Sequence, residues 1–411
     1  MFLKSAIRLK KGSTKFTRSG SPWVYSNELA SFDKNLSPGS WVSLENHDGQ
    51  TLGYGHFNPH SLISFRVFER AAFRSEEQVR ALFFRRLDQA LQLRIKAFQE
   101  AITAREMGAR SFRLAFGESD GVPGLVIDLY ESSPNGMAVV QCHSAGADQF
   151  VFWTQTWLEE RLGISCGVLR NDLEVRRKEQ VRLEVSDWGT LPNEAYALEG
   201  GVRFLIDPKA GQKTGYFYDL RDNRAELARR AARYEEGAVL DCFSYMGGWG
   251  LQVLKKNSKA RLVALDVSKT ALEAVLRNAE ANGFSGRVET VAADFFKDKK
   301  ALGSQKFEIV VCDPPALTSS AKQAAEGRRA HESCFYTALG YLERGGIAAL
   351  SSCSFHLSWD EFLGCVQHAG IGRNAQLKIS HVGSQSADHP ILATLVETRY
   401  IKSVIVEELW P

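Results

Sequence analysis

The sequence predicts an α/β protein whose C-terminal half, residues 199–411, folds around an open sheet of parallel strands. Two observations lead to this prediction. Short apolar strands alternate there with amphipathic helices, which is typical of a parallel sheet with crossover helices. Several of the predicted strands also end on or beside an aspartate, so that their carboxylates would gather at the carboxyl edge of the sheet. These acids are Asp241, Asp266, Asp294 and Asp313.

The length and composition are those of a globular protein with more than one domain. The chain has 411 residues, of which 44% are hydrophobic and 24% charged, and its net charge of +3 does not by itself require nucleic acid as a partner. Seven scattered cysteines without a CxxC pair argue against a zinc site and a disulfide framework. No apolar run reaches the ~18 residues of a membrane span. We therefore expect a cytoplasmic protein without a bound metal.

Residues 1–72 are expected to form a small β-barrel. Short β-type segments such as residues 41–44 and 62–67 are separated there by turn residues at even spacing. The start of this part is basic and has no acid before Glu28. The cations are Lys4, Arg8, Lys10, Lys11, Lys15 and Arg18. They could form an RNA-facing surface, a solvated face or a transit-peptide-like leader, and composition alone favours the solvated face.

Residues 73–198 are expected to form a small central α+β domain. A long helix is predicted over residues 75–106, because apolar side chains recur there at helical spacing without internal glycine or proline. The remaining predicted elements are strands over residues 112–116, 125–128 and 137–142 and a helix over residues 149–162.

Helix signals divide the C-terminal part. Its first helix is predicted over residues 219–236 and should stop at Gly237, since glycine is the usual residue just beyond a helix end. Ser268 is the expected N-cap of a helix that ends at Asn282. Residues 358–361 form a capping box that should open another helix.

The glycine-rich turn at residues 242–250 gives this part the features of an adenosine-type pocket, because its glycines let a ligand approach the backbone. Asp266 follows at the distance expected for an acceptor of ribose hydroxyls, and Asp294 would accept from the adenine amino group. Asp241 and Gly247 would face the methionine portion of S-adenosylmethionine, which we predict as the cofactor. Each acid alone could be a helix N-cap, but the set in register favours a ligand site.

Two further motifs bear on the chemistry. In Asp313-Pro314-Pro315 the prolines fix the backbone just after a strand, which suits a planar heterocycle presenting an amino group and a ring nitrogen. Cys353 ends a strand that should lie beside that motif. A thiolate that adds to C6 of a pyrimidine makes C5 nucleophilic enough to take a methyl group. A buried cysteine is more often an inert apolar residue, so its chemistry alone leaves both interpretations of Cys353 open.

Taken in order, these and other motifs resemble a known family over nearly the whole chain. The family comprises the class I S-adenosylmethionine-dependent large-subunit ribosomal RNA methyltransferases that form 5-methylcytosine and carry an N-terminal PUA domain. The segments that carry the resemblance are residues 21–26, 117–125, 211–224, 313–315, 352–354 and 387–390.

The resemblance implies a PUA-like barrel that binds RNA, a central α+β domain and a Rossmann-like methyltransferase domain. It implies Cys353 as the nucleophile and Asp313 as the acid that orients and activates the cytosine, with ribosomal RNA as the partner. It leaves the oligomeric state open, with a homodimer among the expectations. Residues 213–224 would cover the cofactor and help shape the base pocket. The site residues implied in addition are Gln212, Phe217 and Phe243 for the cofactor and Pro314, Lys213 and Arg221 for the substrate.

The sequence departs from the family's pattern in three places. Trp249 is bulkier than the residue expected beside the methionine tail, and Leu220 stands where a glutamine is expected. Ala316 and Leu317 replace a basic and an aromatic residue, which bears on the base that is methylated. Two alternatives therefore stay open. Methylation of guanine N7 or another RNA base would need no thiolate, and a non-catalytic RNA-binding assembly factor would not bind the cofactor.

Overall fold

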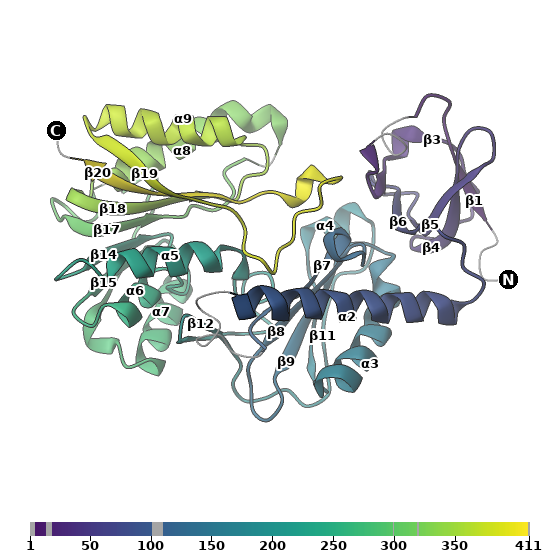
Figure 1. The fold of residues 1–411 in the computed structure, drawn as a ribbon, viewed down its shortest axis with the longest axis horizontal. Coiled ribbons are helices and arrows are strands. Elements are labelled where there is room, and N and C mark those ends of the chain that lie inside the picture. Colours follow the sequence, from purple (N-terminus) through teal and green to yellow (C-terminus); the bar gives the residue numbers. More distant parts are fainter. Residues whose placement is uncertain (1–4, 14–18, 101–109, 299, 319, 410–411) are drawn as a thin grey trace.

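The computed structural model describes residues 5–13, 19–100, 110–298, 300–318 and 320–409. Its elements form three large sheets and one strand pair. Figure 1 shows the N-terminal sheet at one end of the molecule, the C-terminal sheet at the other and the remaining large sheet between them. The predicted α/β class, with a barrel-like N-terminal part and a parallel-sheet C-terminal part, is confirmed.

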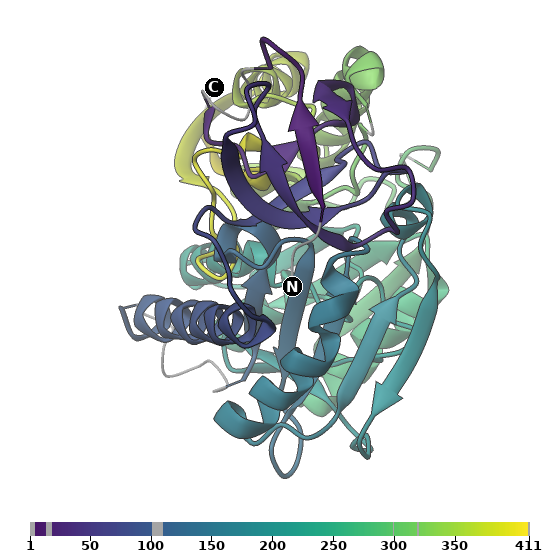
Figure 2. The same ribbon diagram turned by 90° about the vertical axis from the view of Figure 1, so that its right-hand side faces the viewer.

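The N-terminal sheet is a mixed sheet with the order β2-β6-β5-β4-β1-β3. Its core consists of alternate side chains that are wholly buried, among them Ile7, Val42 and Phe57, and Figure 2 shows the strands curving around that core. Its strands are β1 (Ala6–Leu9), β2 (Trp23–Val24), β3 (Leu29–Ser31), β4 (Ser40–Glu45), β5 (Thr51–Phe57) and β6 (Phe65–Glu69).

The basic residues of the N-terminus are only partly described. Arg8 forms an ion pair of 2.9 Å with Glu45, and the ammonium of Lys10 donates to the carbonyl of Asn27. Lys4, Lys15 and Arg18 lie outside the described residues. Arg8 and Lys10 are therefore bound to an acid and a carbonyl of the N-terminal part, whereas Lys11 is exposed.

A long helix, α2 (Glu76–Glu100), leads from the N-terminal sheet to the central one and packs on it with α3 (Val151–Leu162). Phe83 of α2 stacks on Phe150 with ring centroids 4.6 Å apart. The predicted helix ran on to residue 106, and residues 101–106 lie outside the described residues. The central sheet has the order β11-β10-β9-β8-β7, with β7 (Phe112–Phe116), β8 (Leu125–Tyr130), β9 (Met137–Cys142), β10 (Gly167–Asn171) and β11 (Glu184–Trp188).

The C-terminal sheet has the order β16-β15-β14-β17-β18-β20-β19. The first five strands in this order, β16, β15, β14, β17 and β18, run parallel. β20 lies between β18 and β19 and is antiparallel to both. The strand pair β12 (Tyr196–Glu199) and β13 (Val202–Leu205) precedes the sheet. The sheet's strands are β14 (Ala238–Cys242), β15 (Arg261–Asp266), β16 (Val288–Ala292), β17 (Phe307–Cys312), β18 (Leu342–Ser352), β19 (Gln376–Gly383) and β20 (Lys402–Leu409).

Helices cover both faces of this sheet, as crossover connections require. Figure 1 shows α8 and α9 on one face and α5, α6 and α7 on the other. The two faces bury separate apolar clusters, with Leu251 and Val275 in one and Phe335 and Phe362 in the other. The helices are α5 (Arg221–Ala231), α6 (Gly250–Lys256), α7 (Lys269–Ala281), α8 (Ala324–Leu339) and α9 (Trp359–Gly372). None of the helices in the described ranges is both long enough and apolar enough to cross a membrane.

The helix signals of the C-terminal part were correct with one exception. Ser268 caps α7 by accepting from the backbone N–H of Ala271, and the predicted capping box opens α9. The first helix was predicted too long, because α5 begins at Arg221 and ends at Ala231. Gly237 has a φ of +63° and serves the tight turn into β14 instead of ending α5.

Candidate active site

Parallel strands bring the predicted acids together. β14, β15, β16 and β17 are neighbours in the sheet and run in the same direction, so their carboxyl ends share one edge. Asp241 and Asp266 lie at the ends of β14 and β15, whereas Asp294 and Asp313 follow β16 and β17. This edge, where the strands deliver their last side chains, is where a parallel sheet binds a ligand.

Asp241 is wholly buried at the centre of this edge. One carboxylate oxygen accepts from the backbone N–H of Gly250 at 3.0 Å, as a helix cap would. The other oxygen has no hydrogen-bond partner among the described residues. Burial raises the pKa of Asp241 to about 8, against the Gly250 hydrogen bond, and the nearby carboxylates of Asp313 and Asp266 add to the rise. A buried acceptor without a donor is costly, so this atom indicates a missing ligand group.

The turn after β14 is held in an unusual backbone conformation. Phe243 and Tyr245 have φ values of +61° and +49°, and Gly247 has +84°. Residues other than glycine adopt this region at a cost, and such strain is common at functional sites. Asp266 fixes the turn, because its carboxylate accepts from the N–H groups of Tyr245 at 3.0 Å and Ser268 at 2.9 Å. Asp266 is itself partly exposed, which leaves lone pairs for further donors.

Aromatic rings gather near Asp294. The ring of Phe243 lies 5.2 Å from that of Phe295 and 5.6 Å from that of Phe296. Asp294 accepts from the N–H of Phe296 and pairs with Lys297 at 3.0 Å, and the hydrogen bond from Lys297 lowers its pKa. The cluster offers an apolar surface beside a carboxylate, which is the combination that an adenine ring requires.

The segment before α5 covers the same turn. The backbone N–H of Gln212 donates to the hydroxyl of Tyr245 at 3.2 Å, and the rings of Phe217 and Tyr245 are 5.3 Å apart. The ammonium of Lys213 lies 4.5 Å from the centroid of the Phe217 ring. The structure thus places Gln212, Lys213 and Phe217 together with the acids, although they precede them in the sequence.

Asp313 is held by Trp249. The indole N–H donates to a carboxylate oxygen of Asp313 at 3.0 Å, and the tryptophan is 4% exposed. Burial raises the pKa of Asp313 to about 6, and the hydrogen bond from Trp249 limits that rise. The sequence singled out Trp249 for its bulk alone. Its donor group was the signal that could have revealed this contact.

Cys353 follows β18, which pairs in parallel with β17 as predicted. Its side chain is partly exposed. Burial raises the pKa of Cys353 to about 11, the carboxylate of Asp313 adds to the rise, and the ammonium of Lys213 opposes it. The thiol and the carboxyl group of Asp313 are therefore neighbours at this edge, and Pro314, which follows Asp313, is buried. By itself this thiol is protonated at neutral pH.

Three further residues lie at the site, and of these only Asp219 stands in a segment that the sequence singled out, residues 211–224. The hydroxyl of Tyr400 donates to the carboxylate of Asp219 at 2.8 Å. Burial acts to raise the pKa of Asp219. The charge of Lys213 and the hydrogen bond from Tyr400 contribute to outweighing burial, and the pKa is lowered. Lys402, at the start of β20, is also buried near Cys353. These residues come from distant parts of the chain, so only the folded sheet brings them to Cys353.

Arg221 was predicted to bind the substrate, and the structure places it elsewhere. Its side chain is 1% exposed and lies over the rings of Phe98 and Tyr218 at 5.1 and 4.9 Å. Its guanidinium is 3.6 Å from Glu199 and 3.9 Å from Asp388. Because those neighbours enclose it between the central and C-terminal parts, we assign Arg221 to the packing of these parts and not to the substrate.

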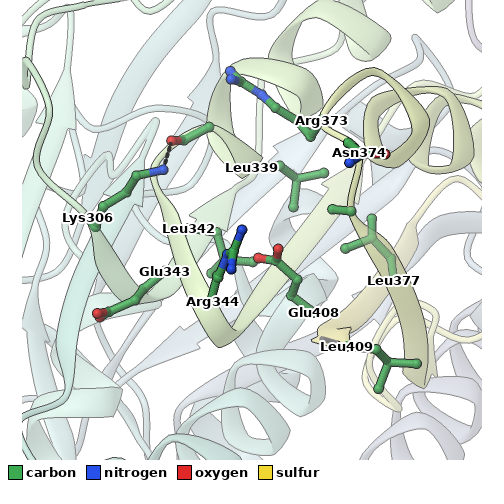
Figure 3. Close-up of a pocket in the computed structure, with 12 residues that line it drawn as sticks. Lys306, Leu339, Leu342, Glu343, Arg344, Arg373, Asn374, Leu377, Glu408 and Leu409 are labelled. Carbon is green, nitrogen blue, oxygen red and sulfur yellow. Dashed lines mark hydrogen bonds between the residues drawn. The ribbon is translucent and has the colours of Figure 1, made fainter. Parts of the chain in front are cut away.

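A separate hollow of about 500 Å³ lies at the opposite edge of the same sheet (Figure 3). It is lined by residues where β17 and β18 begin, including Lys306 and Arg344, together with Glu408 near the end of β20. None of the predicted site residues lines it. Among the described residues, no group of three or more His, Cys, Asp or Glu side chains is arranged to hold a metal ion. The acids at the carboxyl edge therefore remain the candidate site.

Two family models match the chain. Residues 7–70 match a PUA-like domain, and residues 225–357 match a methyltransferase small domain. A solved structure from Streptococcus mutans, assigned to the SAM-dependent methyltransferases, superposes with a TM-score of 0.77. It is 15% identical and covers 98% of this chain and 100% of its own, so it shows that the two chains share a fold.

Known proteins of higher identity match along nearly the whole chain. The ribosomal RNA large subunit methyltransferase I of Aeromonas hydrophila is 33% identical over 98% of this chain and 99% of its own length. The protein of the same name from Citrobacter koseri is 34% identical over 96% of this chain and 97% of its own. These alignments span nearly the whole of both chains, so they cover all three large sheets described above. The chain therefore belongs to the ribosomal RNA large subunit methyltransferase I family.

Proposed function

We propose that this protein transfers the methyl group of S-adenosylmethionine to C5 of a cytosine in large-subunit ribosomal RNA. The observation that carries the proposal is the placement of Cys353 beside Asp313 at the carboxyl edge of the C-terminal sheet. A thiol next to an acid is the pair that attack on a pyrimidine ring requires. Nitrogen methylation would need no thiol at this place.

The residues at the edge fit S-adenosylmethionine. The unpartnered oxygen of Asp241 would accept from the ammonium group of the cofactor, whose charge would also favour the ionised carboxylate. Asp266 would accept from the ribose hydroxyls and Asp294 from the adenine amino group, with Phe243 against the ring. The remaining contacts to the cofactor would come from Gly247, Gln212 and Phe217. When bound, the cofactor supplies an electrophilic methyl group.

Asp313 and Cys353 then act on the base as an acid and a nucleophile. The thiolate sulfur forms a bond to C6, and the displaced electron pair reaches N3, which takes the proton of Asp313. This makes C5 electron-rich, so that it would accept the methyl group that the cofactor supplies. Loss of the C5 proton, return of the N3 proton to Asp313 and cleavage of the C6–sulfur bond restore the aromatic ring and release the thiolate. Lys213 and Pro314 would border the base.

The N-terminal sheet would position the RNA in this proposal. Phosphate contacts fix the register of a nucleic acid, while one extruded base enters the catalytic pocket.

We propose domain boundaries at 1–72, 73–198 and 199–411, supported by the one large sheet that each range contains. A cytoplasmic location is supported by the free state of all seven cysteines. The homodimer stays a prediction, which sedimentation of the purified chain would test.

Mass spectrometry of ribosomal RNA tests the proposed function. RNA from cells that lack this protein should miss one 5-methylcytidine in the large subunit, and expression of the wild-type chain should restore it. Expression of the Cys353→Ala variant should not. A missing methylguanosine, or no missing nucleotide at all, would contradict the proposal.

A further inference from the structure

Lys402 is a buried cation that the mechanism above does not use. It is 3% exposed and begins β20, where its backbone lies opposite Ser352 of β18. Its ammonium donates to the carbonyl of Ser354 at 2.8 Å and to that of Tyr400 at 3.2 Å. Within the described part of the chain, no carboxylate lies at ion-pair distance from this ammonium.

A buried ammonium without an acid is unfavourable, because carbonyl dipoles replace only part of its hydration. Burial lowers the pKa of Lys402 to about 8, and among its charged neighbours Cys353 opposes that fall most strongly. The anion that would best compensate this buried charge is therefore the thiolate of Cys353. This relation is mutual, since an ammonium that favours a thiolate is itself kept charged by it.

The turn that carries Cys353 is held from two sides. The hydroxyl of Ser354 accepts from the N–H of Leu317, which follows Asp313-Pro314-Pro315, at 3.0 Å. The ammonium of Lys402 holds the carbonyl of the same serine from the side of β20. Both contacts act on the residue next to Cys353, so they hold the backbone of the turn that carries the thiol.

We propose that Lys402 is a positioning residue that stabilises the thiolate of Cys353 and holds its turn through the carbonyl of Ser354. The proposal deepens the proposed function and rests on the role of Cys353 in it. Asp313 and Asp219 oppose ionisation of the thiol and Lys213 favours it, so a second cation on the side of β20 would add to the effect of Lys213. The other charged and titratable neighbours of Lys402 are Arg399, Glu361 and His331.

Alkylation of Cys353 in the full-length protein tests this proposal without RNA. The rate at which iodoacetamide modifies Cys353 would be followed against pH by mass spectrometry of its peptide. Lys402→Gln keeps a donor for the Ser354 carbonyl but removes the charge. It should slow alkylation of Cys353 by about tenfold below pH 8, since a loss of that size corresponds to about one pKa unit. Lys402→Arg, which keeps the charge, should restore most of the rate.

Two more variants separate charge from structure. Lys402→Met also removes the donor and should slow alkylation at least as much. Lys378→Met removes an exposed lysine from β19 and should react like the wild type. Thermal melts would establish that each variant folds. Alkylation of Cys353 at the wild-type rate in a folded Lys402→Gln protein would overturn the proposal. Because the assay contains no RNA, its outcome is independent of whether the proposed cytosine reaction is correct.

Discussion

Asp313 and Cys353 titrate on opposite sides of neutrality. Burial raises the pKa of Asp313 to about 6 and that of Cys353 to about 11. Between these two pKa values the pair holds one proton, which either group can carry. The fraction of molecules with a thiolate and a carboxylic acid therefore does not change with pH in this range. Below pH 6 both groups are protonated and the thiolate disappears. We therefore expect the rate of methyl transfer to fall at acid pH with an apparent pKa set by Asp313.

Replacing Trp249 by phenylalanine should move this acid limb. The variant keeps an aromatic ring but loses the indole N–H that holds the ionised carboxylate of Asp313. Because a hydrogen bond to a charged group is worth about 1.5–3 kcal/mol, the acid limb of kcat/KM should shift upward by about one pH unit or more. Measurement of kcat/KM from about pH 5 to about pH 9 checks this expectation.

Trp359→Phe is the matched control, because Trp359 starts α9 and packs its ring against Phe362. Its pH profile should coincide with that of the wild type. An unchanged acid limb in the Trp249→Phe variant would mean that the indole hydrogen bond does not influence the reacting group.

The sequence could predict Asp313 and Cys353 because each stands in a local motif at the end of a strand. It could not predict Lys402 or Tyr400, which reach Cys353 only because β20 inserts antiparallel beside β18. Arg221 was expected at the substrate, and the structure places its side chain elsewhere for a related reason. It lies within a motif-like segment, yet the fold turns its side chain toward Glu199.

At the scale of elements, the pattern of strands could be predicted and the start of α5 could not. Residues before α5 are bound to the central sheet instead of continuing the helix. The N–H of Tyr216 donates to the hydroxyl of Tyr130, and the hydroxyl of Tyr218 donates to the carbonyl of Leu129. Such tertiary contacts override helix propensity, which is a weak local preference. They also hold Gln212 and Phe217 over the turn after β14.

Loss of the Asp266 carboxylate at the end of β15 should disturb both the turn after β14 and the binding of the cofactor. Asp266→Ala removes the acceptor of two backbone N–H groups and the proposed acceptor of the ribose hydroxyls. Affinity for S-adenosylmethionine should fall by about 1–3 kcal/mol, as measured by calorimetry. Ser358→Ala is the control, since loss of that α9 cap should cost about 1 kcal/mol of unfolding free energy without changing affinity. Wild-type affinity in Asp266→Ala would show that the ribose lies elsewhere.

At the scale of the whole molecule, buried charges fix the N-terminal sheet to the central one. Arg66 of β6 pairs with Glu118 at 2.6 Å and lies 3.6 Å from Glu179. The indole N–H of Trp23 donates to Glu118 at 2.7 Å. Although burial acts to raise it, the pKa of Glu118 is lowered by Arg66 and Trp23, so this contact stabilises the protein above the ordinary carboxyl pKa and is lost as pH falls.

Glu118→Gln should loosen the N-terminal sheet without touching the cofactor site. Breaking one partner of a buried ion pair costs at most about 3–5 kcal/mol, and less here because Arg66 would keep Glu179 at 3.6 Å. We expect faster proteolysis between β6 and α2 and weaker binding of ribosomal RNA, with unchanged affinity for S-adenosylmethionine. Glu45→Gln removes a more exposed pair with Arg8 and should change neither. Equal proteolysis of both variants would contradict this role of Glu118.

The order of the parts along the chain could be read from its composition and turn signals. Their relative placement could not, because it depends on side chains that are far apart in the sequence, such as Arg66 and Glu118. The central sheet also contacts the C-terminal part. Asp128 of β8 pairs with Arg113 and accepts from the hydroxyl of Thr214 at 2.5 Å, and Thr214 lies in the segment over the site. The central sheet therefore joins both ends of the molecule.

The covalent bond between Cys353 and C6 of a cytosine is the claim on which the whole account depends. It is tested most directly by the Cys353→Ser variant, with methyl transfer from labelled S-adenosylmethionine to large-subunit ribosomal RNA measured beside cofactor affinity. The account predicts wild-type cofactor affinity and a transfer rate at least about 10³-fold lower, because the hydroxyl cannot replace the thiolate. A folded Cys353→Ser protein that forms 5-methylcytidine at a rate close to that of the wild type would contradict it.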